Sequence, residues 1–219
     1  MPTCLQCEYI NKESSACSLK CDKGGRSFSR NCVYAIWRLE APLCKGKILE
    51  IGGGHWNPPR KNLRKRPDTE YFGVDPRWDD NPKLGGYKGT AAHIPFDGNF
   101  FDRILAFETM EHWGEGGESP QEGLKEIHRV LKPDCTACIT VPIHLHGTKE
   151  FVDGDMKKIK GYFENDMNLW KNVRYEEWRK EFDPLPPAQN WRGKLAHFEK
   201  VSTQKVPSTW TFRINAEKV

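Results

Sequence analysis

The chain has 219 residues, enough for one sizeable hydrophobic core and a small additional segment. Its net charge of +4 is too small to indicate nucleic-acid binding without a local basic cluster. We find no signal peptide and no apolar run of the roughly 18 residues that a membrane span requires. We therefore expect a cytoplasmic protein with no membrane partner.

The first 44 residues contain six of the eight cysteines. The first thirty residues are polar, follow no apolar period, and could not form a packed core unaided. In a cytoplasmic protein such cysteines are more often thiols or metal ligands than disulfides. Two close pairs predict one tetrahedral zinc site. Its expected ligands are Cys4, Cys7, Cys17 and Cys21, with Cys32 in reserve. An iron–sulfur cluster, disulfides and free thiols remain alternatives.

A short helix is expected after Asn31, which would cap it, with Val33, Ile36 and Trp37 on one face. Strands are expected at 47–51, 71–75, 101–107 and 137–142. A helix should begin after Ser119, because Glu122 completes a capping box with it. Its buried stripe should be Leu124, Ile127, Val130 and Leu131, with Pro133 ending the helix.

Two further strands, roughly 197–204 and 209–217, should form an antiparallel hairpin at the C-terminus. Strands that alternate with helices predict an α/β fold, a doubly wound and mostly parallel sheet covered on both faces. We therefore divide the chain into a cysteine-rich segment, 1–44, and one domain, 45–219. Within that domain, residues 147–195 are expected to lie on the acceptor side.

A glycine triplet, Gly52 to Gly54, follows the first strand directly, and Asp75 closes the second. Glycines allow a sharp turn and a close approach to a ligand, because they carry no Cβ. An acid at the end of the second strand is suited to binding the two hydroxyls of a ribose. Together these residues predict a nucleotide-type site at the carboxyl ends of the strands.

Four motifs between residues 45 and 143 together resemble the class I S-adenosylmethionine-dependent methyltransferases. They are EIGGG, GVDP, TAAHIPFDGNFFDRILAFETMEH, and LKEIHRVLKPD followed by a strand that ends in VP. The resemblance implies a Rossmann-like methyltransferase fold, S-adenosylmethionine as cofactor, and methyl transfer as the activity. The cofactor-binding residues that it implies are Glu50, Gly52, Gly53, Gly54, Trp56, Asp75, Pro76, Thr90, Ala91, Phe107 and Glu108.

Two positions depart from the family pattern. Trp56 stands where the family has a third glycine, and Thr90 stands where the family has an acid that holds the adenine amino group. That role would fall to the Thr90 hydroxyl or to the backbone near Ala91. The stretch Asn57-Pro58-Pro59 should prevent a regular helix from starting at once, because each proline restricts the residue before it. We interpret the site as remodelled and still functional.

Catalysis by such a site rests on positioning, and a hydroxyl acceptor also needs a base. Two histidines, His144 and His146, follow the last parallel strand on one extended face, so either could be that base. Glu111 and His112 follow the strand before it and are the other catalytic candidates. The chain lacks N-P-P-Y and D-P-P-F, which mark many enzymes that methylate base amino groups.

We therefore expect O-methylation of a small polar or glycan-linked acceptor. An RNA methyltransferase with an N-terminal zinc site is an alternative. A protein that binds S-adenosylmethionine without turnover is another. The aromatic-rich region after Gly147 could form a wall for the acceptor, although most of its rings should be packing residues.

Overall fold

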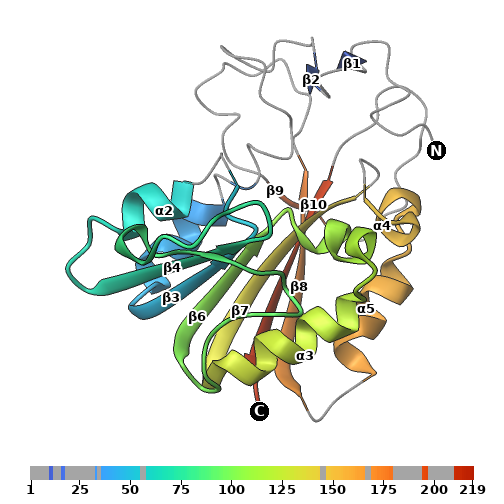
Figure 1. The fold of residues 1–219 in the computed structure, drawn as a ribbon. Helices are drawn as coiled ribbons and strands as arrows, with labels where there is room; N and C mark the ends of the chain where they lie inside the picture. The colour runs from blue at the N-terminus through green and yellow to red at the C-terminus, as the bar shows by residue number, and fades with distance from the viewer. Residues whose placement is uncertain are drawn as a thin grey trace.

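The computed structural model describes residues 10–11, 16–17, 33, 36–54, 58–143, 147–165, 169–179, 194–196 and 210–219. Its main feature is an eight-stranded sheet with the order β5-β4-β3-β6-β7-β10-β8-β9 (Figure 1). The strands are β3 Gly46–Ile51, β4 Thr69–Asp75, β5 Gly86–Lys88, β6 Phe101–Phe107, β7 Leu131–Ile143, β8 Trp170–Arg179, β9 Lys194–Ala196 and β10 Trp210–Lys218.

Strands β5, β4, β3, β6 and β7 are parallel to one another, whereas β10 is antiparallel to both β7 and β8. From β3 the chain first builds outward through β4 and β5 and then crosses to β6 on the other side. The strand order therefore reverses between β3 and β6, which is where open parallel sheets bind ligands.

Two cores lie on the faces of this sheet. Helices α3 Pro120–Val130, α4 Lys149–Asp153 and α5 Met156–Glu164 lie together on one face (Figure 1). The larger core lies there, and it includes Leu124, Phe151 and Phe163. The second core contains Ile36 and Trp37 from the helical residues 36–40. Both faces are thus covered, which confirms the doubly wound architecture with its C-terminal antiparallel strands.

The smaller elements in the described part of the chain are α2 Pro58–Leu63 and the 3-10 helices η2 Ala41–Leu43, η3 Pro82–Leu84 and η4 Met110–Gly116. Strands β1 Ile10–Asn11 and β2 Ala16–Cys17 pair antiparallel with each other. Among the described helices, none is long and apolar enough to cross a membrane.

The strands predicted at 47–51, 71–75, 101–107 and 137–142 and the capped helix are confirmed, with two corrections at helix ends. Ser119 forms the capping box with Glu122 as predicted, but Leu131 is not part of the helical stripe. It starts β7 and pairs with Phe101. The helix ends before Pro133 because a proline disfavours helical backbone in the residue that precedes it.

The second correction concerns the stretch after the glycine turn. Helix α2 begins at Pro58, so the expectation that the two prolines would delay a regular helix was wrong. Prolines are tolerated in a first helical turn, because the N–H groups there have no partner within the helix. The first strand of the predicted C-terminal hairpin, 197–204, lies outside the described residues. The second is β10.

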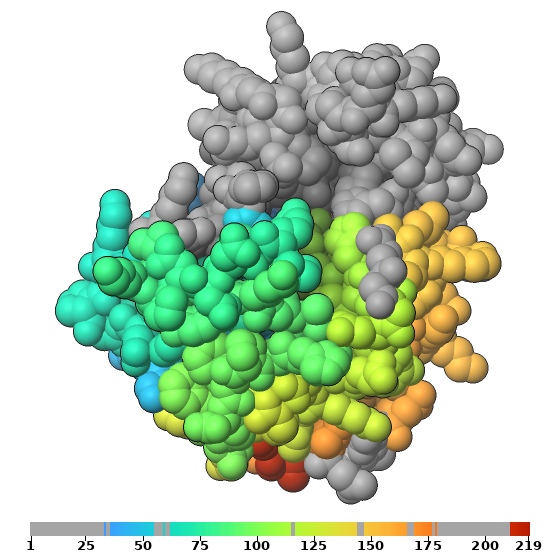
Figure 2. Space-filling model, in the orientation of Figure 1, coloured from blue at the N-terminus to red at the C-terminus, as the bar shows by residue number. Residues whose placement is uncertain are grey.

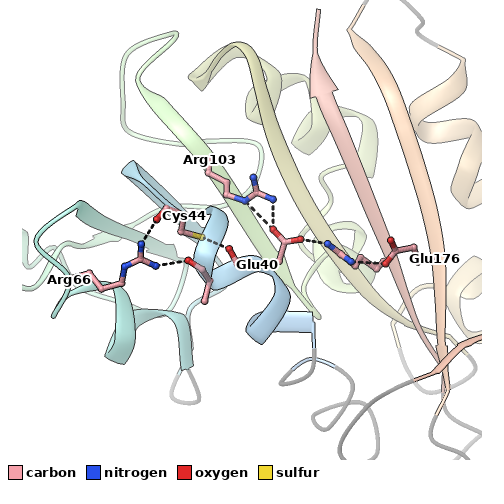
Figure 3. A network of polar contacts seen from close by, with 7 residues as sticks. Glu40, Cys44, Arg66, Arg103 and Glu176 are labelled. Atoms are coloured by element: carbon pink, nitrogen blue, oxygen red, sulfur yellow. Dashed lines mark hydrogen bonds and ion pairs between the residues drawn. The ribbon is translucent and has the colours of Figure 1, made fainter.

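A buried ionic network joins residues 36–44 to the sheet on the face of the second core. The carboxylate of Glu40 accepts hydrogen bonds from Arg103 on β6 and from Arg213 on β10, and Arg213 also donates to Glu176. Figure 3 shows the carboxylate of Glu40 in the middle of this network, with Arg103 on one side and Glu176 on the other. The Cys44 thiol donates to the Glu40 carbonyl oxygen, and burial raises the pKa of that thiol to about 12. The boundary that we predicted at residue 44 stays a prediction.

Candidate cofactor and acceptor site

The carboxyl ends of β3, β4 and β6 meet at one edge of the sheet, the upper edge in Figure 1. The predicted site residues in the described part of the chain follow these strands or their neighbours β5 and β7. We take them in the order in which they line that edge.

The glycine turn after β3 has the backbone that only glycine adopts without strain. Gly52 and Gly54 have φ values of 71° and 40°. A Cβ atom on Gly52 would lie 2.1 Å from Cγ2 of Thr109, so the loop after β6 packs directly against the turn. The Gly52 N–H donates to the carbonyl of Val74 at 2.8 Å, which joins the turn to the end of β4.

Asp75 holds this turn from the end of β4. Its carboxylate is 1% exposed, and Oδ2 accepts a hydrogen bond from the Gly54 N–H at 2.9 Å. Burial by itself would raise the pKa of Asp75, but hydrogen bonds from Arg77 and Gly54 outweigh it and hold the pKa below its ordinary value. Asp75 is therefore ionised at neutral pH. Pro76, which follows it, is exposed.

Glu50 is the second-last residue of β3, just before the glycine turn. It is 4% exposed, and its Oε2 accepts a hydrogen bond from the hydroxyl of Tyr71 at 2.8 Å. The neighbouring strand thus fixes the carboxylate of Glu50 near the start of the glycine turn.

The segment after β5 carries the other predicted contacts to the nucleoside. Ala91 is 3% exposed, and the Thr90 hydroxyl donates to Glu118 Oε1 at 2.8 Å. Figure 2 shows the segment between β4 and β6 beside the segment that contains η4 and α3, and this hydrogen bond joins the two. A carboxylate therefore lies next to Thr90, although it comes from residue 118 rather than residue 90.

The loop after β6 begins with an unusual backbone conformation. Glu108 has a φ of 54°, which is uncommon for a residue other than glycine and is often found at functional sites. Its N–H donates to the Thr140 carbonyl at 2.9 Å, and its Oε1 accepts from the Thr211 hydroxyl at 3.3 Å. Phe107, at the end of β6, is half-buried. The strands β7 and β10 thus hold Glu108 at the edge.

Glu111 and His112 lie together just beyond, on η4. Glu111 is completely buried, and the side chain of His112 is 43% exposed. The imidazole Nε2 of His112 lies 3.7 Å from Oε1 of Glu111. The other catalytic candidates, His144 and His146, lie outside the described residues, as does Trp56.

The predicted metal ligands are not tested by the structure. Cys4, Cys7, Cys21 and the reserve Cys32 lie outside the described residues, and for Cys17 only the backbone in β2 is described. No group of three metal-ligating side chains occurs elsewhere in the part of the chain that the structure describes.

Three residues at this edge were not predicted from the sequence. Arg77 binds Asp75, Glu118 binds Thr90, and Thr109 packs on Gly52. Thr109 is 9% exposed, and its hydroxyl has no hydrogen-bond partner among the described residues. The position of Arg77, two residues after Asp75, could have indicated a local ion pair. The partners of Thr90 and Gly52 come from distant segments, and no local pattern marks them.

Comparison with known proteins agrees with this geometry. Residues 49–139 match the family model described as a methyltransferase domain. The 2-methyl-6-phytyl-1,4-hydroquinone methyltransferase 2 of Oryza sativa subsp. japonica is 37% identical over 57 residues, which are 26% of this chain and 15% of that protein. The corresponding enzyme of Arabidopsis thaliana is 33% identical over 57 residues, which are 26% of this chain and 16% of that protein. The alignments thus cover about a sixth of the length of these relatives.

Solved structures share the fold over most of the chain. A SAM-dependent methyltransferase from Archaeoglobus fulgidus superimposes with a TM-score of 0.55 at 19% identity, covering 86% of this chain and 94% of the other. Phosphoethanolamine N-methyltransferase 2 from Haemonchus contortus, in complex with S-adenosyl-L-methionine, gives a TM-score of 0.53 at 15% identity, covering 88% and 53%. Residues 49–139 therefore match a methyltransferase domain, and the chain has the fold of solved S-adenosylmethionine-dependent methyltransferases.

Proposed function

We propose that the chain is an S-adenosylmethionine-dependent methyltransferase that acts on an oxygen of a small polar or glycan-linked acceptor. The observation that carries this proposal is the buried, ionised Asp75, held by the Gly54 N–H at the end of β4. A ribose can donate both of its hydroxyls to such a carboxylate, and the glycines of the turn beside it carry no Cβ that would keep a ligand from the backbone. The residues present therefore fit the cofactor.

When bound, S-adenosylmethionine supplies a methyl group that the sulfonium has already activated. The chain has to position the acceptor in line with it and exclude water, which can supply much of the rate. Asp75 and the turn Gly52 to Gly54 would hold the cofactor, which would supply the methyl group to the acceptor oxygen and would be left as a neutral thioether. The acceptor hydroxyl loses its proton to a base, and the histidines after β6 and β7 are the candidates.

Replacing Asp75 with alanine should weaken the binding of S-adenosylhomocysteine by about 1–3 kcal/mol, because the ribose hydroxyls lose a charged acceptor. Isothermal titration calorimetry measures this change. Asp102→Ala is a matched control, since Asp102 also accepts a backbone N–H, from Lys47, and pairs with a cation, Lys132. Asp102 lies near the start of β6, at the end of the strand away from the proposed site. Equal affinity in wild type and Asp75→Ala would mean that the ribose site is elsewhere.

An acceptor screen would follow the release of S-adenosylhomocysteine with sugars, nucleotide sugars, phenols and amino alcohols. The last two classes are included because the names of similar proteins refer to a hydroquinone and to phosphoethanolamine. Turnover on RNA, with affinity that falls steeply as salt rises, would favour the RNA alternative. Cofactor binding with no turnover on any acceptor would favour the non-catalytic alternative.

We further propose that Cys4, Cys7, Cys17 and Cys21 bind one zinc ion. The support is their spacing and the polar composition of the segment around them. Elemental analysis of anaerobically purified protein should give one zinc per chain, and that zinc should fall sharply in Cys4→Ser/Cys7→Ser. Iron with a brown colour would indicate a cluster instead, and a metal-free protein with reactive thiols would contradict both.

A further inference from the structure

Arg77 occupies the carboxylate that the proposed ribose contact requires. Three of its N–H groups donate to Asp75: the backbone N and Nε to Oδ1, both at 2.9 Å, and Nη2 to Oδ2 at 2.8 Å. With the bond from Gly54, each oxygen of Asp75 accepts two hydrogen bonds. A carboxylate oxygen has about two acceptor sites, so additional donors must replace existing ones.

The guanidinium also lies over the glycine turn. A Cβ atom on Gly54 would be 2.9 Å from Nη2 of Arg77 and 3.9 Å from Oδ2 of Asp75. The space that glycine leaves open at this position is therefore filled by the side chain of Arg77. A ribose that reached Asp75 from this side would have to displace that side chain.

Moving the Arg77 side chain away from Asp75 requires only a modest free energy. Its side chain is 66% exposed, so the guanidinium can move into water without being buried elsewhere. Exposed ion pairs are weak, but the two-pronged contact with a buried carboxylate makes this one stronger than most. The backbone N–H of Arg77 and that of Gly54 can keep their bonds to Asp75 while the ribose hydroxyls replace Nε and Nη2.

We propose that Arg77 is an affinity-determining residue that competes with the cofactor ribose for Asp75. The inference rests on the proposed function, because it assumes that Asp75 binds a ribose. It does not make Arg77 a catalytic residue. Its consequence is that the chain binds its cofactor more weakly than the Asp75 carboxylate alone would allow.

The experiment uses S-adenosylhomocysteine, whose neutral thioether limits direct repulsion between Arg77 and the ligand. In calorimetry, Arg77→Ala should bind about three- to tenfold more tightly than wild type. The control is Arg129→Ala, which removes the same charge and breaks a similar pair, with Glu126, on α3. Its affinity should equal that of wild type.

Salt supplies a readout that a purely structural role would not give. Raising the salt from about 0.05 M to about 0.5 M screens the exposed side of the ion pair, so the affinity gap between wild type and Arg77→Ala should narrow. Equal or weaker binding by Arg77→Ala, with wild type binding normally, would overturn this inference and leave the proposed function standing. Absence of binding by wild type, Arg77→Ala and Arg129→Ala alike would overturn both.

Discussion

Replacing Glu40 with glutamine should lower the free energy of unfolding by about 3–5 kcal/mol, the usual cost of removing one partner from a buried ionic group. Glu40 is 0% exposed, and its two partners are nearly buried: the side chains of Arg103 and Arg213 are 12% and 9% exposed. Glutamine keeps the size of the side chain but leaves two buried guanidinium groups short of a negative charge. Urea denaturation followed by circular dichroism measures the change.

Two further variants test this expectation, one as a control and one for coupling between Glu40 and Arg213. Asp153→Asn breaks an exposed pair with Lys149 and should leave the urea midpoint unchanged, because such pairs contribute little. In the double variant Glu40→Gln/Arg213→Met the loss should be smaller than the sum of the two single losses, since both residues belong to one network. Additive losses would mean that Glu40 and Arg213 act independently, which would contradict the network.

This network also shows what local sequence patterns could not supply. Glu40 is 63 residues from Arg103 in the sequence and 173 residues from Arg213. Each lies in an ordinary helical or strand pattern, and nothing in that pattern marks a buried charge. Only the packing of residues 36–40 onto β6 and β10 brings the three charges together.

The elements themselves were predictable where the local signal is strong. The strands at 101–107 and 71–75 are rich in apolar residues, and Ser119 with Glu122 marks the start of α3 through hydrogen bonds that form locally. The start of α2 at Pro58 was not predictable by the same reasoning. A proline disfavours helical backbone in the residue before it, but it is acceptable in the first turn of a helix. The prediction took only the first of these effects into account.

The residues of the site also fall into those that the local sequence predicts and those that only the tertiary structure shows. Asp75 and Gly54 were predicted from their places after β4 and β3, and the structure brings them within hydrogen-bond distance of each other. For Thr90 the sequence predicted a hydroxyl role, and the structure adds a carboxylate beside it from Glu118. That carboxylate is 28 residues away, so only the tertiary arrangement shows it.

The chemistry of the acceptor leads to the other large expected effect. Replacing His112 with asparagine should lower turnover by about 10²–10⁴-fold, the usual contribution of a positioned base. His112 follows β6 at the edge that carries the glycine turn, and its side chain is exposed. The buried carboxylate of Glu111 lies 3.7 Å from Nε2, close enough to hold the imidazole in one orientation.

The decisive comparison is among three histidines, because His144 and His146 remain candidates from the sequence. His112→Asn, His144→Asn and His146→Asn are assayed with the acceptor that the screen supplies, and each is titrated with S-adenosylhomocysteine. The base is the histidine whose loss lowers kcat by the expected factor while ligand affinity stays at the wild-type value. We expect kcat of the wild type to fall towards acid pH as the base becomes protonated, and the variant that lacks the base should not show this fall.

Glu111→Gln separates a base at His112 from a merely structural role for η4. This variant keeps the shape of the buried side chain and removes its charge, so turnover should fall less than in His112→Asn while S-adenosylhomocysteine binds normally. If His144→Asn or His146→Asn alone abolishes turnover, the base lies after β7 and His112 is a surface residue. If all three histidine variants keep full turnover, the acceptor gives up its proton without a histidine and the rate comes from positioning.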